Sequence, residues 1–213
     1  MSHRGTFAKN SYPWLFSMFF FFLNLLLDCS VLHNDLSSSM YQSLSNVKAS
    51  PPKHVLPKEL DIIVNDATCC PTHMLAVCSS SPQPNEPRQI TMYPTHHLVL
   101  ASHCANLPPL PPSCPSLPGP SSTSSTVTIP VVSLCIPSPP TFPLLHSYLY
   151  TKDVRHLVSA LFSLSDPDAP KRQAALIHGV WSNAYALGVV DENLFDVLDK
   201  AWALVSAKLR VSS

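Results

Sequence analysis

The sequence predicts an α+β fold in which a few short strands are followed by a C-terminal helical half. Most of its 23 prolines lie between residues 51 and 143. Proline removes a backbone donor and interrupts helices, so this part of the chain favours short extended segments. After Leu144 only Pro167 and Pro170 remain, and apolar residues recur at helical spacing. At 213 residues the chain is long enough for one core of ordinary size.

The first 39 residues form an apolar N-terminal segment. Residues 14–27 read WLFSMFFFFLNLLL and follow several basic side chains, as in a secretory signal or a membrane anchor. A helix of this length spans about 21 Å, less than the roughly 30 Å hydrocarbon core of a bilayer. A clean small-residue cleavage pair is missing, and Met40 opens an in-frame segment that reads as a start. The sequence therefore leaves three interpretations of this segment open: a secretory signal, a membrane anchor or an upstream extension.

Short strands are predicted in the middle of the chain. Residues 40–59 are rich in Ser, Pro and Lys, which predicts a flexible lead-in without a packed face, with order beginning near Leu60. Residues 61–64 and 74–78 are apolar runs that predict a hairpin-like pair of strands. A further extended segment is predicted at residues 90–93.

The next stretch combines a helix start, an insertion and a strand. Residues 97–102 turn apolar and predict the beginning of a helix. Residues 106–125 are low-complexity Pro/Ser sequence, which predicts a disordered, exposed insertion. Residues 127–136 are β-rich but contain Pro130, which is tolerated on an edge strand and not in a sheet interior. We therefore predict an edge strand there.

The C-terminal half predicts four helices. Phe142 begins an i, i+3, i+7 apolar pattern, and a second apolar stripe starts at Val154. Asp168 opens the third helix and Asp191 can cap the fourth. Gly188 suits the C-terminal cap between them. Three aromatic residues fall on these helices at helical spacing, and we expect them in the core: Trp181, Tyr185 and Trp202.

Composition excludes several classes of function. The chain has 13 Lys and Arg residues and 13 Asp and Glu residues, so it carries no net positive charge that would attract nucleic acid. Direct binding to nucleic acid is therefore not expected. With four glycines, the chain has no phosphate-cradling loop, and the motifs G-x-S-x-G and H-E-x-x-H are missing. We therefore predict neither an enzyme nor a cofactor.

The cysteines indicate reduced thiols. There are seven, an odd number, without CxxC pairs, which is not typical of a disulfide framework. Cysteines and histidines between residues 69 and 104 are ligand types for zinc, but they form no CxxC or HxxxH pair that would supply two ligands from one turn. No metal site is predicted.

Several stretches follow the order found in BTB/POZ domains. A strand at 61–64 precedes a histidine-led helix with Val-Leu-Ala, and an F-x-x-L-x-x-Y-x-Y-T helix end comes later. The sequence thus resembles this fold, which implies a BTB-like interaction domain over residues 60–213 with the insertion at 106–125. The resemblance implies a structural role for the leading histidine. The candidate interaction or fold-signature residues are His97, Val99, Leu100, Phe142, Leu145, Tyr148 and Tyr150.

A more specific resemblance joins two segments. Residues 96–115 and 129–154 are similar to the clampless-type proteins of mushroom-forming fungi, over about residues 50–210. The resemblance implies a non-enzymatic regulator of clamp-cell formation and dikaryotic growth, downstream of mating-type control, in the nucleus or cytoplasm. Its expected partners are proteins, such as transcriptional or cell-cycle regulators, and BTB-like domains often form homodimers.

Partner binding is expected through exposed helix faces and through the unpaired edge at residues 127–136. The alternative is a secreted or membrane-anchored fungal protein of unknown role. In that case residues 14–27 are a true targeting element, and the cysteines pair after export.

Overall fold

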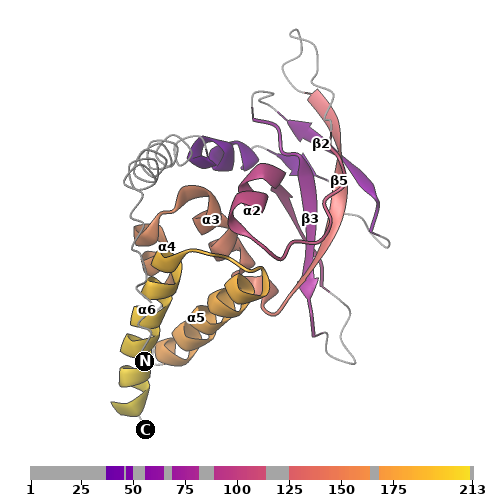
Figure 1. Cartoon of the computed structure of the whole chain (residues 1–213). Coiled ribbons are helices and arrows are strands. Elements are labelled where there is room, and N and C mark those ends of the chain that lie inside the picture. Colours follow the sequence, from indigo (N-terminus) through magenta and orange to yellow (C-terminus); the bar gives the residue numbers. More distant parts are fainter. Residues whose placement is uncertain are drawn as a thin grey trace, which may run out of the picture.

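The computed structural model describes residues 37–45, 47–49, 56–64, 69–81, 89–113, 125–163 and 168–211. In these ranges a curved sheet lies beside a group of helices, and the strands precede most of the helices in the chain (Figure 1). The predicted α+β class, with a helical C-terminal half, is confirmed.

The sheet contains five strands in the order β1-β2-β5-β3-β4. They are β1 (Lys48–Ala49), β2 (Glu59–Val64), β3 (His73–Ser79), β4 (Thr91–Thr95) and β5 (Ser125–Ile136). The predicted hairpin between the first two apolar runs is wrong, because β5 lies between β2 and β3. The β3 strand is buried over almost its whole length and so must pair its backbone on both sides. It pairs antiparallel with β4 and parallel with β5.

The strand at 127–136 is central, so the edge-strand prediction is wrong. The β2 strand pairs with residues 125–130 of β5, and β3 pairs with residues 131–136, so the partner changes after Pro130. The Val131 N–H donates to the carbonyl of Lys58 on the β2 side at 2.8 Å. Because successive residues point their backbone groups to opposite edges, the missing donor of Pro130 falls on the β3 side, where that ladder has not yet begun. Proline is tolerated there for this reason.

The helices pack against one face of the sheet and against one another. They are α2 (His97–His103), the short 3-10 helix η1 (Pro139–Thr141), α3 (Phe142–Thr151), α4 (Val154–Leu161), α5 (Ala169–Ala186) and α6 (Glu192–Val211). All of the predicted helices are present. The α3 helix lies at the centre, with seven buried residues. The main core joins β3, β5 and every one of these α-helices.

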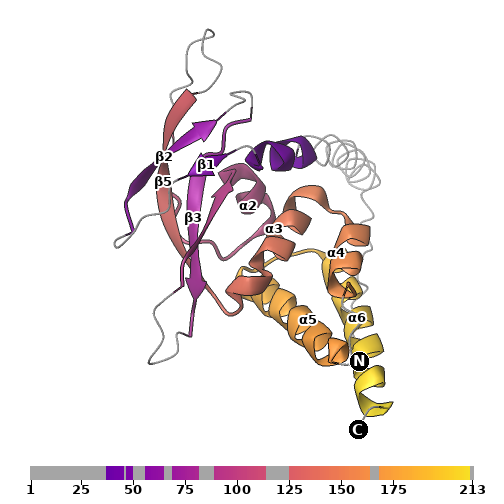
Figure 2. The same cartoon turned by 180° about the vertical axis from the view of Figure 1, so that it is seen from behind.

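Residues 37–45 contain packed structure, although a flexible lead-in was predicted from residue 40 onward. A helix at 37–44 lies beside the sheet and α2 in both views (Figures 1 and 2). Its Leu44 side chain is buried together with Val99 and Tyr150. Apolar side chains of this short helix therefore complete the core, although the surrounding sequence is polar.

The insertion predicted at 106–125 is described up to residue 113. Its start is held in place, because the Ala105 and Asn106 N–H groups donate to the carbonyls of Gly188 and Leu187. Gly188 has a φ of 64°, as its predicted role in a helix C-terminal cap requires. Ser125 at the end of the predicted insertion begins β5, while residues 114–124 and the apolar run at 14–27 lie outside the described residues. Within the described ranges, no helix has the length and apolar character needed to cross a membrane.

Candidate protein-interaction surface

Six of the seven predicted signature residues are buried, and the seventh is exposed. The buried ones are Val99, Leu100, Phe142, Leu145, Tyr148 and Tyr150. His97 is exposed at the start of α2, where its N–H donates to Thr72 Oγ1 at 2.7 Å. The six buried side chains hold α2 and α3 in the core, so they offer no surface to a partner.

The Tyr150 hydroxyl connects α3 to the junction of β4 and α2. It accepts the N–H of His96 at 2.7 Å and lies 3.1 Å from both Thr95 Oγ1 and His96 Nδ1. Burial raises the pKa of Tyr150 to about 12, so the phenol stays neutral. The hydroxyl therefore satisfies a backbone donor that is inaccessible to water.

His146 lies inside an aromatic cluster and was missed by the sequence reasoning. Its ring stacks on Phe142 at 5.5 Å between centroids and meets Tyr150 edge-on at 5.0 Å. The rings of Tyr41 and Tyr93 also contact the His146 ring. Burial, with a smaller effect of the His96 charge, lowers the pKa of His146 to about 4. The sequence did contain one signal for a buried histidine here, because His146 lies four residues before the core residue Tyr150 in an apolar helix.

Asp191 caps α6, as predicted, and it also forms an ion pair. Its carboxylate accepts the Leu194 N–H at 3.1 Å and pairs with Lys152 Nζ at 2.9 Å. The Tyr148 hydroxyl donates to the same carboxylate at 3.3 Å. Burial alone raises the pKa of Asp191, but the hydrogen bond and charge of Lys152 outweigh it and lower the pKa. The network connects α3 to α6.

The thiol of Cys104 lies close to this network. Burial raises its pKa to about 12 despite the nearby Lys152 ammonium, so the sulfur is a thiol and a poor nucleophile. Within the part of the chain that the structure describes, no group of three or more His, Cys, Asp or Glu side chains could hold a metal ion.

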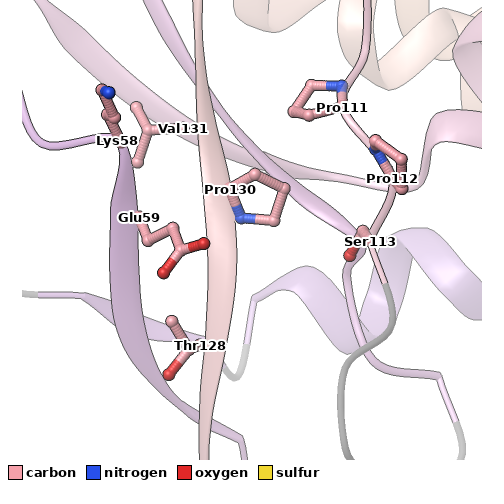
Figure 3. Close-up of a pocket in the computed structure, with 8 residues that line it drawn as sticks. All are labelled: Lys58, Glu59, Pro111, Pro112, Ser113, Thr128, Pro130 and Val131. Atoms are coloured by element: carbon pink, nitrogen blue, oxygen red, sulfur yellow. The ribbon is translucent and has the colours of Figure 1, made fainter.

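A hollow beside the sheet has three prolines among its eight lining residues. It has a volume of about 560 Å³ and lies between the β2–β5 pair and residues 111–113. Figure 3 shows Pro111 and Pro112 on one side and Pro130 on the other. The charged side chains of this hollow, Lys58 and Glu59, are exposed. The Ser113 Oγ atom in its wall is buried and has no hydrogen-bond partner among the described residues. A single hydroxyl is too little to orient a ligand, so we assign the hollow none.

A groove between α5 and α6 is the most distinctive surface of the described chain. It has a volume of about 310 Å³ and is lined by Ile177, His178, Trp181, Leu198, Asp199 and Trp202. The side chains of Trp181 and Trp202 are 41% and 46% exposed. Tyr185 is 71% exposed and stacks on Trp181, with centroids 5.5 Å apart and rings 4° from parallel. Aromatic residues grouped in this way are typical of protein interfaces.

The prediction that these three aromatic residues lie in the core is wrong. Helical spacing identifies which side chains share a face, but it does not say which face turns inward. The core side of α5 is formed by Ile177, Val180 and Ala184. The aromatic side chains lie next to this stripe and remain partly in solvent.

The fold and this surface define an α+β protein with an exposed aromatic groove in its helical half. Two family models match the chain: the Clampless protein 1 N-terminal domain over residues 31–137 and the Clampless protein 1 C-terminal domain over residues 107–213. The chain belongs to the clampless protein family, as its resemblance predicted. Membership indicates a role in clamp formation and development. Comparisons with curated proteins and with solved structures find no match.

Proposed function

We propose that this protein is a non-enzymatic interaction module that regulates clamp-cell formation and dikaryotic growth, and that it binds a protein partner through the α5–α6 groove. The observation that carries the proposal is the pair of half-exposed tryptophans in one groove, extended by the stacked Tyr185. Tryptophan and tyrosine are enriched among residues that dominate binding energy.

The shape of the groove favours a helical partner segment. It runs between two helices, and a third amphipathic helix is the element that fits such a surface. The buried side chains of Ile177 and Leu198 form an apolar floor between Trp181 and Trp202. The Asp199 carboxylate at the rim favours a partner with a Lys or Arg beside its apolar residues.

The order of the elements supports a BTB/POZ-like interpretation of the fold. The β3–β4 strand pair is followed directly by the histidine-led α2, and β5 then returns parallel to β3 before α3. The resemblance implies a strand pair, then a histidine-led helix and later the helix that begins at Phe142, and this part of the order supports the interpretation. We extend the proposal to partners among transcriptional or cell-cycle regulators in the nucleus or cytoplasm, and to a homodimer. Strand addition at residues 127–136 is not part of it, because β5 is central.

The test compares partner capture by C-terminally tagged full-length proteins from mating hyphae. The Trp181→Ala, Trp202→Ala double variant is expected to bind its main partner at least about 30-fold more weakly, the change in affinity typical of removing interface hot spots. The matched control is Leu98→Ala, which removes a 57% exposed apolar side chain from α2. Unfolding curves of both variants should match the wild type. Equal capture by the double variant, with its fold intact, would contradict the proposal.

Photo-crosslinking identifies what occupies the groove. A photoreactive phenylalanine at position 185 is expected to link to a helical partner segment with large apolar residues and a nearby Lys or Arg. N-terminal sequencing of the same bait determines whether residues 1–39 are present. A bait trimmed near residue 30, recovered with secretory partners, would favour the exported alternative.

A further inference from the structure

Two cysteines lie side by side at the centre of the sheet. Cys78 on β3 and Cys135 on β5 are directly opposite each other in the parallel ladder, and their sulfur atoms are 3.1 Å apart. Neighbouring strands are about 4.8 Å apart, which falls within the Cα separations that disulfides span. A disulfide bond is about 2.0 Å long, so the two sulfurs need to approach by only about 1 Å.

The pair is also accessible from one side. Cys78 is buried, whereas Cys135 is exposed. The adjacent Leu134 and Ile136 turn into the main core, so Cys135 occupies the opposite face of the strand. An oxidant in solution can therefore reach Cys135, and Cys78 lies beside it as the resolving thiol. By contrast, Cys104 is buried and lies on the helix side of the sheet.

We propose that Cys78 and Cys135 form a reversible disulfide when the protein meets a peroxide, and that this bond locks β3 to β5. The Cys135 thiolate attacks a peroxide oxygen, which gives a sulfenic acid and releases water after protonation. The Cys78 thiolate then attacks the sulfenic sulfur, the S–S bond forms, and a second water leaves. Two thiols thus lose two electrons and two protons in total, and one hydrogen peroxide is reduced to two waters.

The bond would restrain a large part of the fold. The two cysteines are 57 positions apart, and the chain between them includes β4, α2 and the Pro/Ser-rich insertion. Cross-linking a loop of this size lowers the conformational entropy of the unfolded chain. We expect oxidation to raise the Tm of the full-length protein by about 5–15 °C, and dithiothreitol to reverse the shift.

The test treats the reduced full-length protein with hydrogen peroxide, blocks remaining thiols with a maleimide, and maps the peptides by mass spectrometry. A Cys78–Cys135 linked peptide is expected, with a mass two hydrogens lower. The primary variant is Cys135→Ser, because that side chain is exposed and its replacement leaves the core intact. It should abolish both the linked peptide and the Tm shift, whereas Cys69→Ser should retain them.

Three results would overturn the inference. The first is oxidation of Cys135 to a sulfinic acid while Cys78 is labelled by maleimide. The second is a Tm shift that persists in the Cys135→Ser variant. The third is a linked peptide that joins a different pair of cysteines.

Discussion

Acid should destabilise this protein through His146, whose imidazole is 4% exposed within the aromatic cluster of α3. Burial lowers its pKa from 6.5 to about 4 in the folded state. Between these two pH values the unfolded chain binds a proton that the folded chain excludes. The contribution of neutral His146 to the free energy of unfolding is therefore fully present above pH 6.5 and is lost as the pH falls towards 4. At 1.36 kcal/mol per pKa unit, the loss amounts to about 3 kcal/mol.

The assay is urea unfolding of the wild type and of His146→Phe between pH 7.5 and pH 4.5. Phenylalanine keeps the ring beside Phe142 and removes the titrating group. We expect the wild type to lose about 2–3 kcal/mol more than the variant over this range. Burial also lowers the pKa values of His73 and His96, so both proteins should lose some stability in common.

The matched control is His156→Phe, which replaces an exposed histidine on α4. Its loss of stability with acid should equal that of the wild type. If His146→Phe and the wild type lose the same free energy of unfolding between the two pH values, the folded protein does not exclude the proton from His146, and the reasoning is refuted.

Three further changes are expected to alter the free energy of unfolding, measured with urea at pH 7. Tyr150→Phe should cost about 1–3 kcal/mol, because the buried His96 N–H loses its acceptor, whereas Tyr185→Phe on the surface should cost almost nothing. Gly179→Ala should cost about 1–2 kcal/mol, since its β-carbon would lie 2.6 Å from a neighbouring side-chain oxygen, and this clash outweighs the better helix propensity of alanine. Asp191→Ala should cost about 2–3 kcal/mol through loss of the cap and the ion pair. The part of the last effect that depends on charge should shrink as the pH falls below 3.8 and through the lowered pKa of the carboxylate, and an effect that is unchanged by acid would contradict its assignment to charge.

The predicted site and the observed one differ for a physical reason. The signature residues were identified from their order in the chain, and the fold uses six of them as core. The groove was missed because exposure depends on which side of α5 meets α6, and helical spacing treats both sides alike. Trp181 and Ile177 are four positions apart on one helix, yet only Ile177 is buried. No local pattern distinguishes them.

The sequence by itself determined the helices of the C-terminal half, the strand-forming runs, the cap at Asp191 and the family. Each of these depends on residues close together in the chain, such as the i, i+3, i+7 spacing from Phe142 to Leu149, both of which are fully buried. Only the tertiary structure decided that β5 separates β2 from β3, that His146 is enclosed by aromatic rings, and that Cys78 faces Cys135. These contacts join segments tens of residues apart, and their free energies depend on the shape and burial of the assembled core, which a local pattern of residues does not contain.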